Sequence, residues 1–258
     1  MDGSSDRAVQ DRVIRALADA RYRVSPEWLV QQLADPDRLE RYAHFLARHF
    51  YHERLVQFFK YSRALARVTG RHPEAVLTQP AFDALLPGVV LGSRDTARAV
   101  AGLAVAYVGA APMSIPYLKE LLSYEEAMMV VEAGPRIWRD REVGAAGPET
   151  GAAPTLVEGT VILELTYDLP AVLPELLRPW TAVPLAPQRP TTLLVARSPH
   201  GRVAVARSDA TVAALVRFAD GERSLAQLAA ETGLAVRELE ATVQGLVELG
   251  ALRFSTGS

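Results

Sequence analysis

Histidines in a basic segment near the N-terminus are the first residues whose spacing could support chemistry. His44, His49, His52 and Glu53 recur at helical spacings, which could bring imidazoles and a carboxylate to one metal ion. A bundle metal site needs ligands from a second helix, and only His72 and His200 remain in the sequence. We therefore expect no metal site. A freestanding metalloenzyme that uses the three clustered histidines stays open as an alternative, and it would bind stoichiometric metal.

A second candidate is the carboxylate group formed by Glu120, Glu125 and Glu126, which lies beside Tyr117 and Tyr124. Paired carboxylates can serve as general acid and base. No nucleophile elbow, Walker A loop or dinucleotide fingerprint accompanies them. The absence of cysteine excludes a thiol nucleophile, thiolate zinc sites and Cys-ligated iron–sulfur clusters. We expect a docking face here, and we expect that the chain is not an enzyme.

The elements that position these residues are helical in the first half of the chain. From Asp6 to about Gly134, apolar residues recur at helical spacing. Ser25-Pro26 and Asp35-Pro36 combine an N-cap with proline at the first helical position. The second of these pairs opens a long helix that we expect to stop near Gly70.

The long helix has a predicted apolar stripe and a predicted basic face. The stripe consists of Tyr42, Phe45, Leu46, His49, Leu55, Phe58, Phe59, Ser62 and Leu65. We expect His49 to be a hydrogen-bonded core or interface residue because it falls on this stripe. The basic face consists of Arg41, Arg48, Arg54, Lys60, Arg63, Arg67 and Arg71. Further helices are predicted over about Ser93–Val108 and from Ser114-Ile115-Pro116 to Gly134.

After a Gly, Ala and Pro-rich stretch, the pattern changes to strands. The runs 160–167 and 191–197 are β-rich, and the second meets 202–206 across Ser198–Gly201 in a predicted hairpin. Three helices should follow, over 209–218, 225–232 and 236–249, with a short return strand after Gly250. This predicts an α+β chain with an all-α helical domain at 1–140, a linker at 141–157, and a winged-helix-like domain with a short antiparallel sheet at 158–258.

Composition limits the class of protein. The chain has 258 residues, of which 49% are hydrophobic and 22% charged, enough for one large core or two modest ones. No apolar run reaches the roughly 18 residues of a membrane span. The start is polar and acidic, unlike a secretory signal. We expect a soluble cytoplasmic protein without a membrane partner.

The last predicted helix distinguishes two kinds of binding module. A DNA-reading helix favours basic and amide side chains, but residues 236–249 contain Arg237 against Glu238, Glu240 and Glu248. Phosphate would repel such a helix, so nucleic acid is not the expected partner. A free strand edge beside this helix could instead accept an extended peptide as an added strand. A DNA-binding helix-turn-helix regulator remains the alternative.

Several stretches together resemble the partner proteins of multinuclear non-haem iron oxidative enzymes, which modify ribosomally made peptides and include the methanobactin system. The resembling segments are HFYHERLVQFFKYSRALAR, IPYLKELLSYEEAMM and VILELTYDLPAVLPELL. The final stretch, residues 191–233, resembles leader-peptide recognition modules related to the PqqD-type chaperone, and DGERSLAQLA is its most specific part. These segments cover well over half of the chain in the expected order.

The resemblance implies a non-catalytic subunit that forms a heterodimer with an iron enzyme and holds the leader of a precursor peptide. No cofactor is expected in this chain, and iron is expected in the partner enzyme. The implied peptide-binding residues are Leu163, Leu165, Leu194, Val195, Arg197, Val203, Val205, Leu239 and Val243. The implied enzyme-docking residues are Tyr117, Tyr124, Glu125, Tyr167 and Asp168. The sequence does not determine which strand edge is free.

Overall fold

The computed structural model describes residues 3–31, 35–133, 153–233 and 235–254. The chain divides into two compact units, Met1–Ser114 and Ile115–Ser258. Helices predominate, and two small antiparallel sheets lie in the second unit. The chain therefore belongs to the α+β class, as the sequence predicts.

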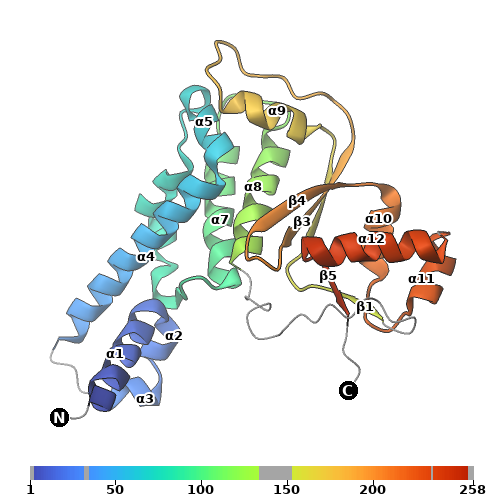
Figure 1. Cartoon of the computed structure of the whole chain (residues 1–258). Coiled ribbons are helices and arrows are strands. Elements are labelled where there is room, and N and C mark those ends of the chain that lie inside the picture. Colours follow the sequence, from blue (N-terminus) through green and yellow to red (C-terminus); the bar gives the residue numbers. More distant parts are fainter. Residues whose placement is uncertain (1–2, 32–34, 134–152, 234, 255–258) are drawn as a thin grey trace. The chain divides into compact units, whose positions relative to one another are not determined.

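The first unit is built from helices of very different lengths (Figure 1). They are α1 (Gly3–Ala18), α2 (Ala20–Arg23), α3 (Pro26–Leu29), α4 (Pro36–Phe58), α5 (Lys60–Thr69), the 3-10 helix η1 (Pro73–Thr78), α6 (Pro80–Asp83), the 3-10 helix η2 (Leu86–Gly88) and α7 (Arg94–Gly109). The side chains of Ser25, Asp35 and Ser93 accept hydrogen bonds from backbone amides at three of the starts. Gly70 ends α5 in the left-handed conformation, so these predicted boundaries are confirmed. The single long helix predicted from Asp35 to Gly70 is instead divided at Phe59 into α4 and α5.

The buried stripe of α4 differs from the predicted one in its first half. The structure buries Ala43, Ala47 and Tyr51, whereas Tyr42, Phe45 and His49 are exposed. The prediction that His49 is a core residue is therefore wrong, and its alternative, that His49 is an interface residue, stays a prediction. Small alanines allow neighbouring elements to approach the helix closely, which turns the larger aromatic side chains outward. The later part of the predicted stripe, which runs on into α5, agrees with the structure, because Leu55, Phe58, Phe59, Ser62 and Leu65 are all buried.

The second unit contains both sheets (Figure 1). Its elements are α8 (Leu118–Glu132), β1 (Pro154–Leu156), β2 (Val161–Leu165), α9 (Leu169–Leu176), β3 (Thr191–Arg197), β4 (Val203–Ser208), α10 (Ala210–Phe218), α11 (Leu225–Thr232), α12 (Val236–Leu249) and β5 (Leu252–Phe254). The predicted hairpin is formed by β3 and β4, and the three predicted helices that follow it are present. The helix α9 is not among the predicted elements, and Pro170 and Pro174 interrupt its Leu and Val positions.

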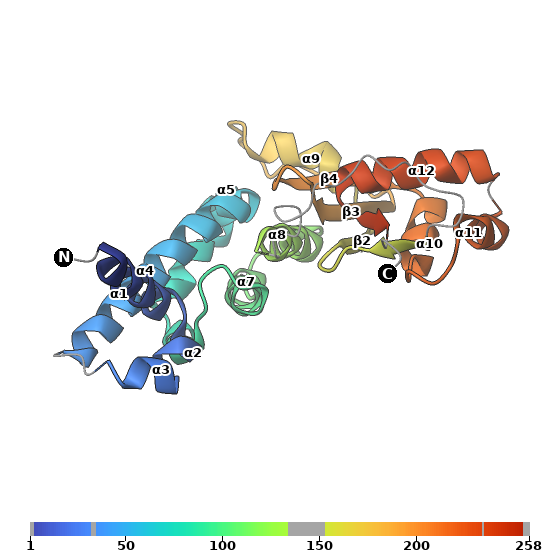
Figure 2. The ribbon, with the colours of Figure 1, turned by 60° about the horizontal axis from the view of Figure 1, so that its bottom comes forward.

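The three-stranded sheet has the order β2-β3-β4 and lies between two layers of helix (Figures 1 and 2). On one face, Ala127 and Val131 of α8 pack against Val195 of β3. On the opposite face, Leu194 and Ala196 of β3 share a core with α10, α11 and α12. Because strand side chains alternate between faces, a run of consecutive apolar residues in β3 is buried only when both faces are covered.

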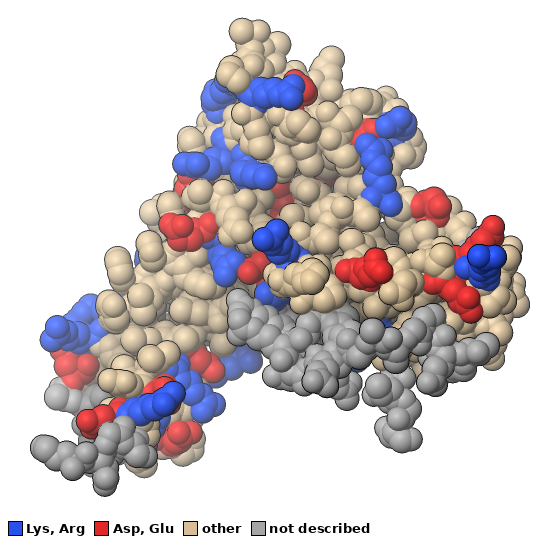
Figure 3. All heavy atoms as spheres, in the orientation of Figure 1, with Lys and Arg blue, Asp and Glu red and all other residues tan. Residues whose placement is uncertain are grey.

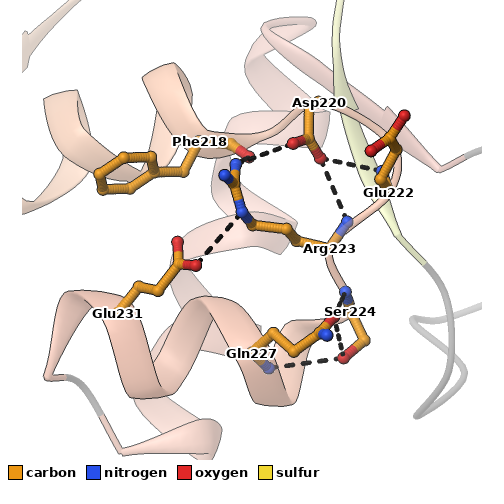
Figure 4. A network of polar contacts seen from close by, with 7 residues as sticks. All are labelled: Phe218, Asp220, Glu222, Arg223, Ser224, Gln227 and Glu231. Carbon is orange, nitrogen blue, oxygen red and sulfur yellow. Dashed lines mark hydrogen bonds and ion pairs between the residues drawn. The ribbon is translucent and has the colours of Figure 1, made fainter.

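The segment DGERSLAQLA, residues 220–229, holds the turn between α10 and α11 (Figure 4). Arg223 donates to the Phe218 carbonyl and the Asp220 carboxylate, and it forms an ion pair with Glu231. Asp220 also accepts from the backbone amides of Glu222 and Arg223, and these bonds lower the pKa of its carboxyl. Ser224 and Gln227 form the predicted capping box of α11. The segment thus fixes the start of α11.

The division between the units differs from the predicted one. The sequence analysis placed 115–140 in the helical domain, whereas α8 packs on the sheet and belongs to the second unit. Of the predicted linker 141–157, residues 141–152 lie outside the described residues. The remainder includes β1, which pairs antiparallel with β5 in a two-stranded sheet. Within the described ranges, none of the helices has the length and apolar composition of a membrane span.

The close approach of Gly250 to β3 gives a first prediction. Gly250 ends α12 with a φ of 85°, and a Cβ at this position would lie 2.1 Å from the carbonyl oxygen of Arg197. We expect Gly250→Ala to lower the free energy of unfolding by at least about 2 kcal/mol, because it combines a steric clash with an unfavourable backbone conformation. Urea unfolding of the full chain measures this change.

Gly245→Ala in the same helix is the matched control. No atom lies within 4 Å of a Cβ at Gly245, and the residue is helical and exposed. Alanine should therefore raise the unfolding free energy by about 0.5–1 kcal/mol. Equal effects of the two substitutions would show that the packing of Gly250 on β3 contributes nothing to stability.

Candidate functional site

The three-stranded sheet of the second unit has two outer strands, β2 and β4, and the outer edge of β4 is the one that lies in the predicted hairpin. Among the described strands, β3 is central, and β2 occupies its other side. No described strand pairs with β4 on the side away from β3. Among the described strands, β2 and β4 are therefore the outer strands and β3 is paired on both sides, which narrows the open edge to two strands.

The register identifies which backbone groups of β4 face outward. The hairpin begins with a hydrogen bond from the Ser198 amide to the Arg202 carbonyl. Hydrogen-bonded and non-hydrogen-bonded pairs alternate in an antiparallel ladder. The hydrogen-bonded positions of β4 are therefore Ala204, Ala206 and Ser208, whose backbone amides and carbonyls face β3. The non-hydrogen-bonded positions are Val203, Val205 and Arg207, and they direct their amides and carbonyls outward. The edge offers three donor and acceptor positions to an added strand.

Most of the predicted peptide-binding side chains lie in the core of the second unit. The buried residues are Leu165, Leu194, Val195, Arg197, Leu239 and Val243. Leu163 and Val203 are half-buried and pack against the core under α8. Only Val205 is exposed, at 37%. A peptide could contact the buried side chains only if the core opened. Of the predicted peptide-binding region, the backbone of β4 and the Val205 side chain remain accessible.

A polar network lies at the end of the β4 edge. Asp168, which precedes α9, is fully buried, and its carboxylate accepts from Arg189 and from Arg207, the latter at 2.6 Å. The Asp168 amide donates to the Pro187 carbonyl at 2.9 Å. Both arginine side chains remain at least half exposed. The buried carboxylate thus joins the start of α9, the segment before β3, and the edge strand.

The charges around Asp168 determine its protonation state. Burial raises the pKa of a carboxyl group, but hydrogen bonds and charge from Arg189 and Arg207 outweigh it and lower the pKa of Asp168 below the ordinary value. The aspartate is therefore ionised at neutral pH. Two guanidinium groups against one carboxylate leave a net positive charge at the end of β4.

Residues at the start of α8 contact the connection between β2 and α9. The Glu120 carboxylate accepts from the backbone amides of Thr166 and Tyr167, at 2.8 and 3.0 Å. The rings of Tyr117 and Tyr167 meet edge to face, and the Tyr117 hydroxyl donates to the Pro184 carbonyl. Burial raises the pKa of Tyr117 to about 12, so the hydroxyl remains a donor well into the alkaline range. These contacts order the connection between β2 and α9.

The structure brings together three of the five predicted docking residues. Tyr117, Tyr167 and Asp168 belong to the connected network, while Tyr124 and Glu125 lie further along α8 and are buried. Tyr117 and Asp168 are buried too, so the predicted docking face is mainly an internal support. Sequence reasoning missed Arg189 and Arg207 as partners of Asp168, because no local pattern indicates an ion pair between residues 21 and 39 positions apart.

The histidine cluster of the first unit does not form a ligand set in the structure. His44 contacts Glu40, His49 stacks on Phe45, and His52 contacts Glu53. Across the described ranges, no three His, Asp or Glu side chains lie close enough to hold one metal ion.

Comparison with known proteins adds no family assignment. No protein-family model matches the chain, and a search of curated proteins finds no significant match.

Removal of the Asp168 charge gives a second prediction. We expect Asp168→Asn to lower the unfolding free energy at pH 7 by about 2–3 kcal/mol, because hydrogen bonds to charged groups are lost in a buried site. The folded-state pKa is below the ordinary value, so the contribution is complete above about pH 4 and is lost as pH falls through the folded-state pKa. The difference between the variant and the unsubstituted chain should therefore shrink in acid.

Glu164→Gln is the control for this prediction. Glu164 forms an ion pair with Arg217, but both side chains are more than half exposed. Its replacement should cost about 0.5 kcal/mol or less. A pH series of urea unfolding curves compares the two variants, and an Asp168→Asn chain that is as stable as Glu164→Gln at pH 7 would contradict the structural role of the network.

Proposed function

We propose that this chain is a non-catalytic, cytoplasmic partner subunit that docks on a multinuclear non-haem iron enzyme and presents the leader of a ribosomally made precursor peptide. The observation that carries the proposal is the outer edge of β4, where Val203, Val205 and Arg207 direct backbone donors and acceptors away from the sheet. An extended leader can add here as a further antiparallel strand. The resemblance of the sequence to partner proteins of such enzymes supplies the class of peptide.

The arrangement around the edge suits backbone recognition. A peptide bound through main-chain hydrogen bonds does not need the side chains that the sheet has already buried. Val205 offers exposed apolar surface, and Ala204 and Ala206 leave the opposite face of β4 with small side chains. Tethering of the leader raises the concentration of the modifiable residue at the enzyme without new chemistry in this chain.

The order of β-hairpin and three helices is also typical of winged-helix modules, which often bind DNA. Charge disfavours that function here. Glu238, Glu240 and Glu248 outnumber Arg237 on α12, and the face in Figure 3 shows acidic side chains over this helix. Phosphate would be repelled from it. Fold analogy alone does not establish DNA binding, so we favour the peptide.

Co-purification tests the proposed assembly. The untagged chain is mixed with a tagged candidate iron enzyme, with and without the precursor peptide, and the eluate is measured by light scattering and metal analysis. A heterodimer with iron bound to the enzyme is the expected result. A chain that stays alone, ignores the peptide and shifts duplex DNA at physiological salt would replace the proposal with the regulator.

A substitution at the edge tests the binding mode. Val205→Pro removes the one outward amide at the centre of β4 and leaves the bonds between β4 and β3 intact, because proline is tolerated at strand edges. We expect peptide affinity to fall at least about tenfold, with enzyme binding retained. Val205→Ala is the matched control, since it shortens the side chain but keeps the amide, and circular dichroism checks that both variants fold. Unchanged affinity in Val205→Pro would exclude strand addition at β4.

A further inference from the structure

A hollow in the first unit is unrelated to the strand edge. It has a volume of about 650 Å³ and is lined by residues of α1 and of the first half of α4. These two helices pack against each other; Figures 1 and 2 show their course. Val13 and Leu17 of α1 and Leu39, Tyr42 and Phe45 of α4 supply its apolar lining. The volume falls within the range of pockets that bind ligands or partner side chains.

Aromatic rings continue this apolar surface along α4. Phe45 stacks between Tyr42 and His49, with ring centroids 6.2 and 6.4 Å apart. Tyr42 is 52% and Phe45 is 61% exposed. Single exposed apolar side chains are ordinary, but ordered rings that adjoin a hollow form a contiguous surface of the kind found at protein–protein contacts.

The charges at the rim indicate the character of the occupant. Arg38 and Arg41 also line the hollow, and no carboxylate in the described part of the chain forms an ion pair with either guanidinium. The nearby carboxylate of Asp35 already accepts from the backbone amide of Arg38 and caps α4. The rim is therefore positive, and its free donors fit carboxylates on a partner.

The secondary structure around the hollow indicates the conformation of the occupant. A peptide that binds as an added strand needs an open ladder for its backbone groups, and the described part of the first unit contains only an isolated bridge between Asp19 and Val90. A helix satisfies its own backbone hydrogen bonds and can place an apolar stripe in a groove between two helices. We propose that the α1–α4 groove binds an acidic amphipathic helix of a partner protein, with its apolar stripe on Phe45 and its carboxylates on Arg38 and Arg41.

Two synthetic helical peptides of about 18 residues test this proposal, since shorter ones are barely helical alone. They share leucines at i, i+3, i+4 and i+7 and alanines at most other positions, and carry glutamate in one peptide and lysine in the other at a few positions that flank the leucines. Fluorescence anisotropy with the full chain measures both affinities. We expect the acidic peptide to bind at least about tenfold more tightly in low salt, with a smaller preference as salt screens the charges.

Substitutions in the groove should change this preference in a defined way. Arg38→Glu with Arg41→Glu should reverse it, and Phe45→Ser should weaken both peptides. The controls are Arg202→Glu, an exposed charge reversal in the second unit, and Val24→Ser, which removes an apolar side chain that is 73% exposed outside the groove. Both controls should leave the affinities unchanged.

Four results would overturn the proposal. They are equal affinity for the two peptides, no saturation by either below about 1 mM, affinities insensitive to the groove substitutions, and a homodimer in light scattering that Phe45→Ser abolishes. The last result would assign the groove to a second copy of this chain. Because the test uses only the first unit's surface, its outcome is independent of peptide binding at β4.

Discussion

Burial of β3 on both faces is the constraint on which the second unit depends. Leu193, Leu194 and Val195 are almost completely removed from solvent, and burial of each such side chain contributes about 1.5–3 kcal/mol. Neighbouring residues in a strand point to opposite faces, so no single layer of helices can cover all three. The unit therefore needs α8 on one face and α10–α12 on the other. The two layers come from segments far apart in the sequence.

This double covering limits what the sheet can use for binding. Side chains that satisfy the core are unavailable to a partner, whereas the backbone of an outer strand is not consumed by packing. Binding at β4 would therefore depend on main-chain groups, with Val205 as a side-chain contact. The network around Asp168 fits this arrangement, because it connects Arg207 of the edge strand to the start of α9 without placing an unpaired charge in the interior.

In the first unit, the large aromatic side chains in the first half of α4 lie on the surface instead of in the core. Small side chains, Ala43 and Ala47, occupy the buried face of α4 in its first half, and the large rings of Tyr42 and Phe45 remain on the surface. Close helix packing gains from small residues as well as from large ones. An exposed aromatic surface, with two arginines at its rim that form no ion pair within the described ranges, is suited to a partner that supplies apolar side chains together with carboxylates.

The sequence by itself determined the local elements of this protein. Caps at Ser25, Asp35 and Ser93, the hairpin turn at Ser198–Gly201, and the capping box at Ser224 all involve residues within a few positions of each other, so their signals are contained in short windows. Helical periodicity likewise predicted α12 and the later part of the apolar stripe, which lies in α4 and α5. Tertiary structure decided the rest: the side of the sheet that α8 covers, the exposure of Phe45, the two arginines on Asp168, and the outer positions of β2 and β4 among the described strands. Each of these depends on contacts between distant segments, and periodicity shows that a face is apolar but not which partner covers it.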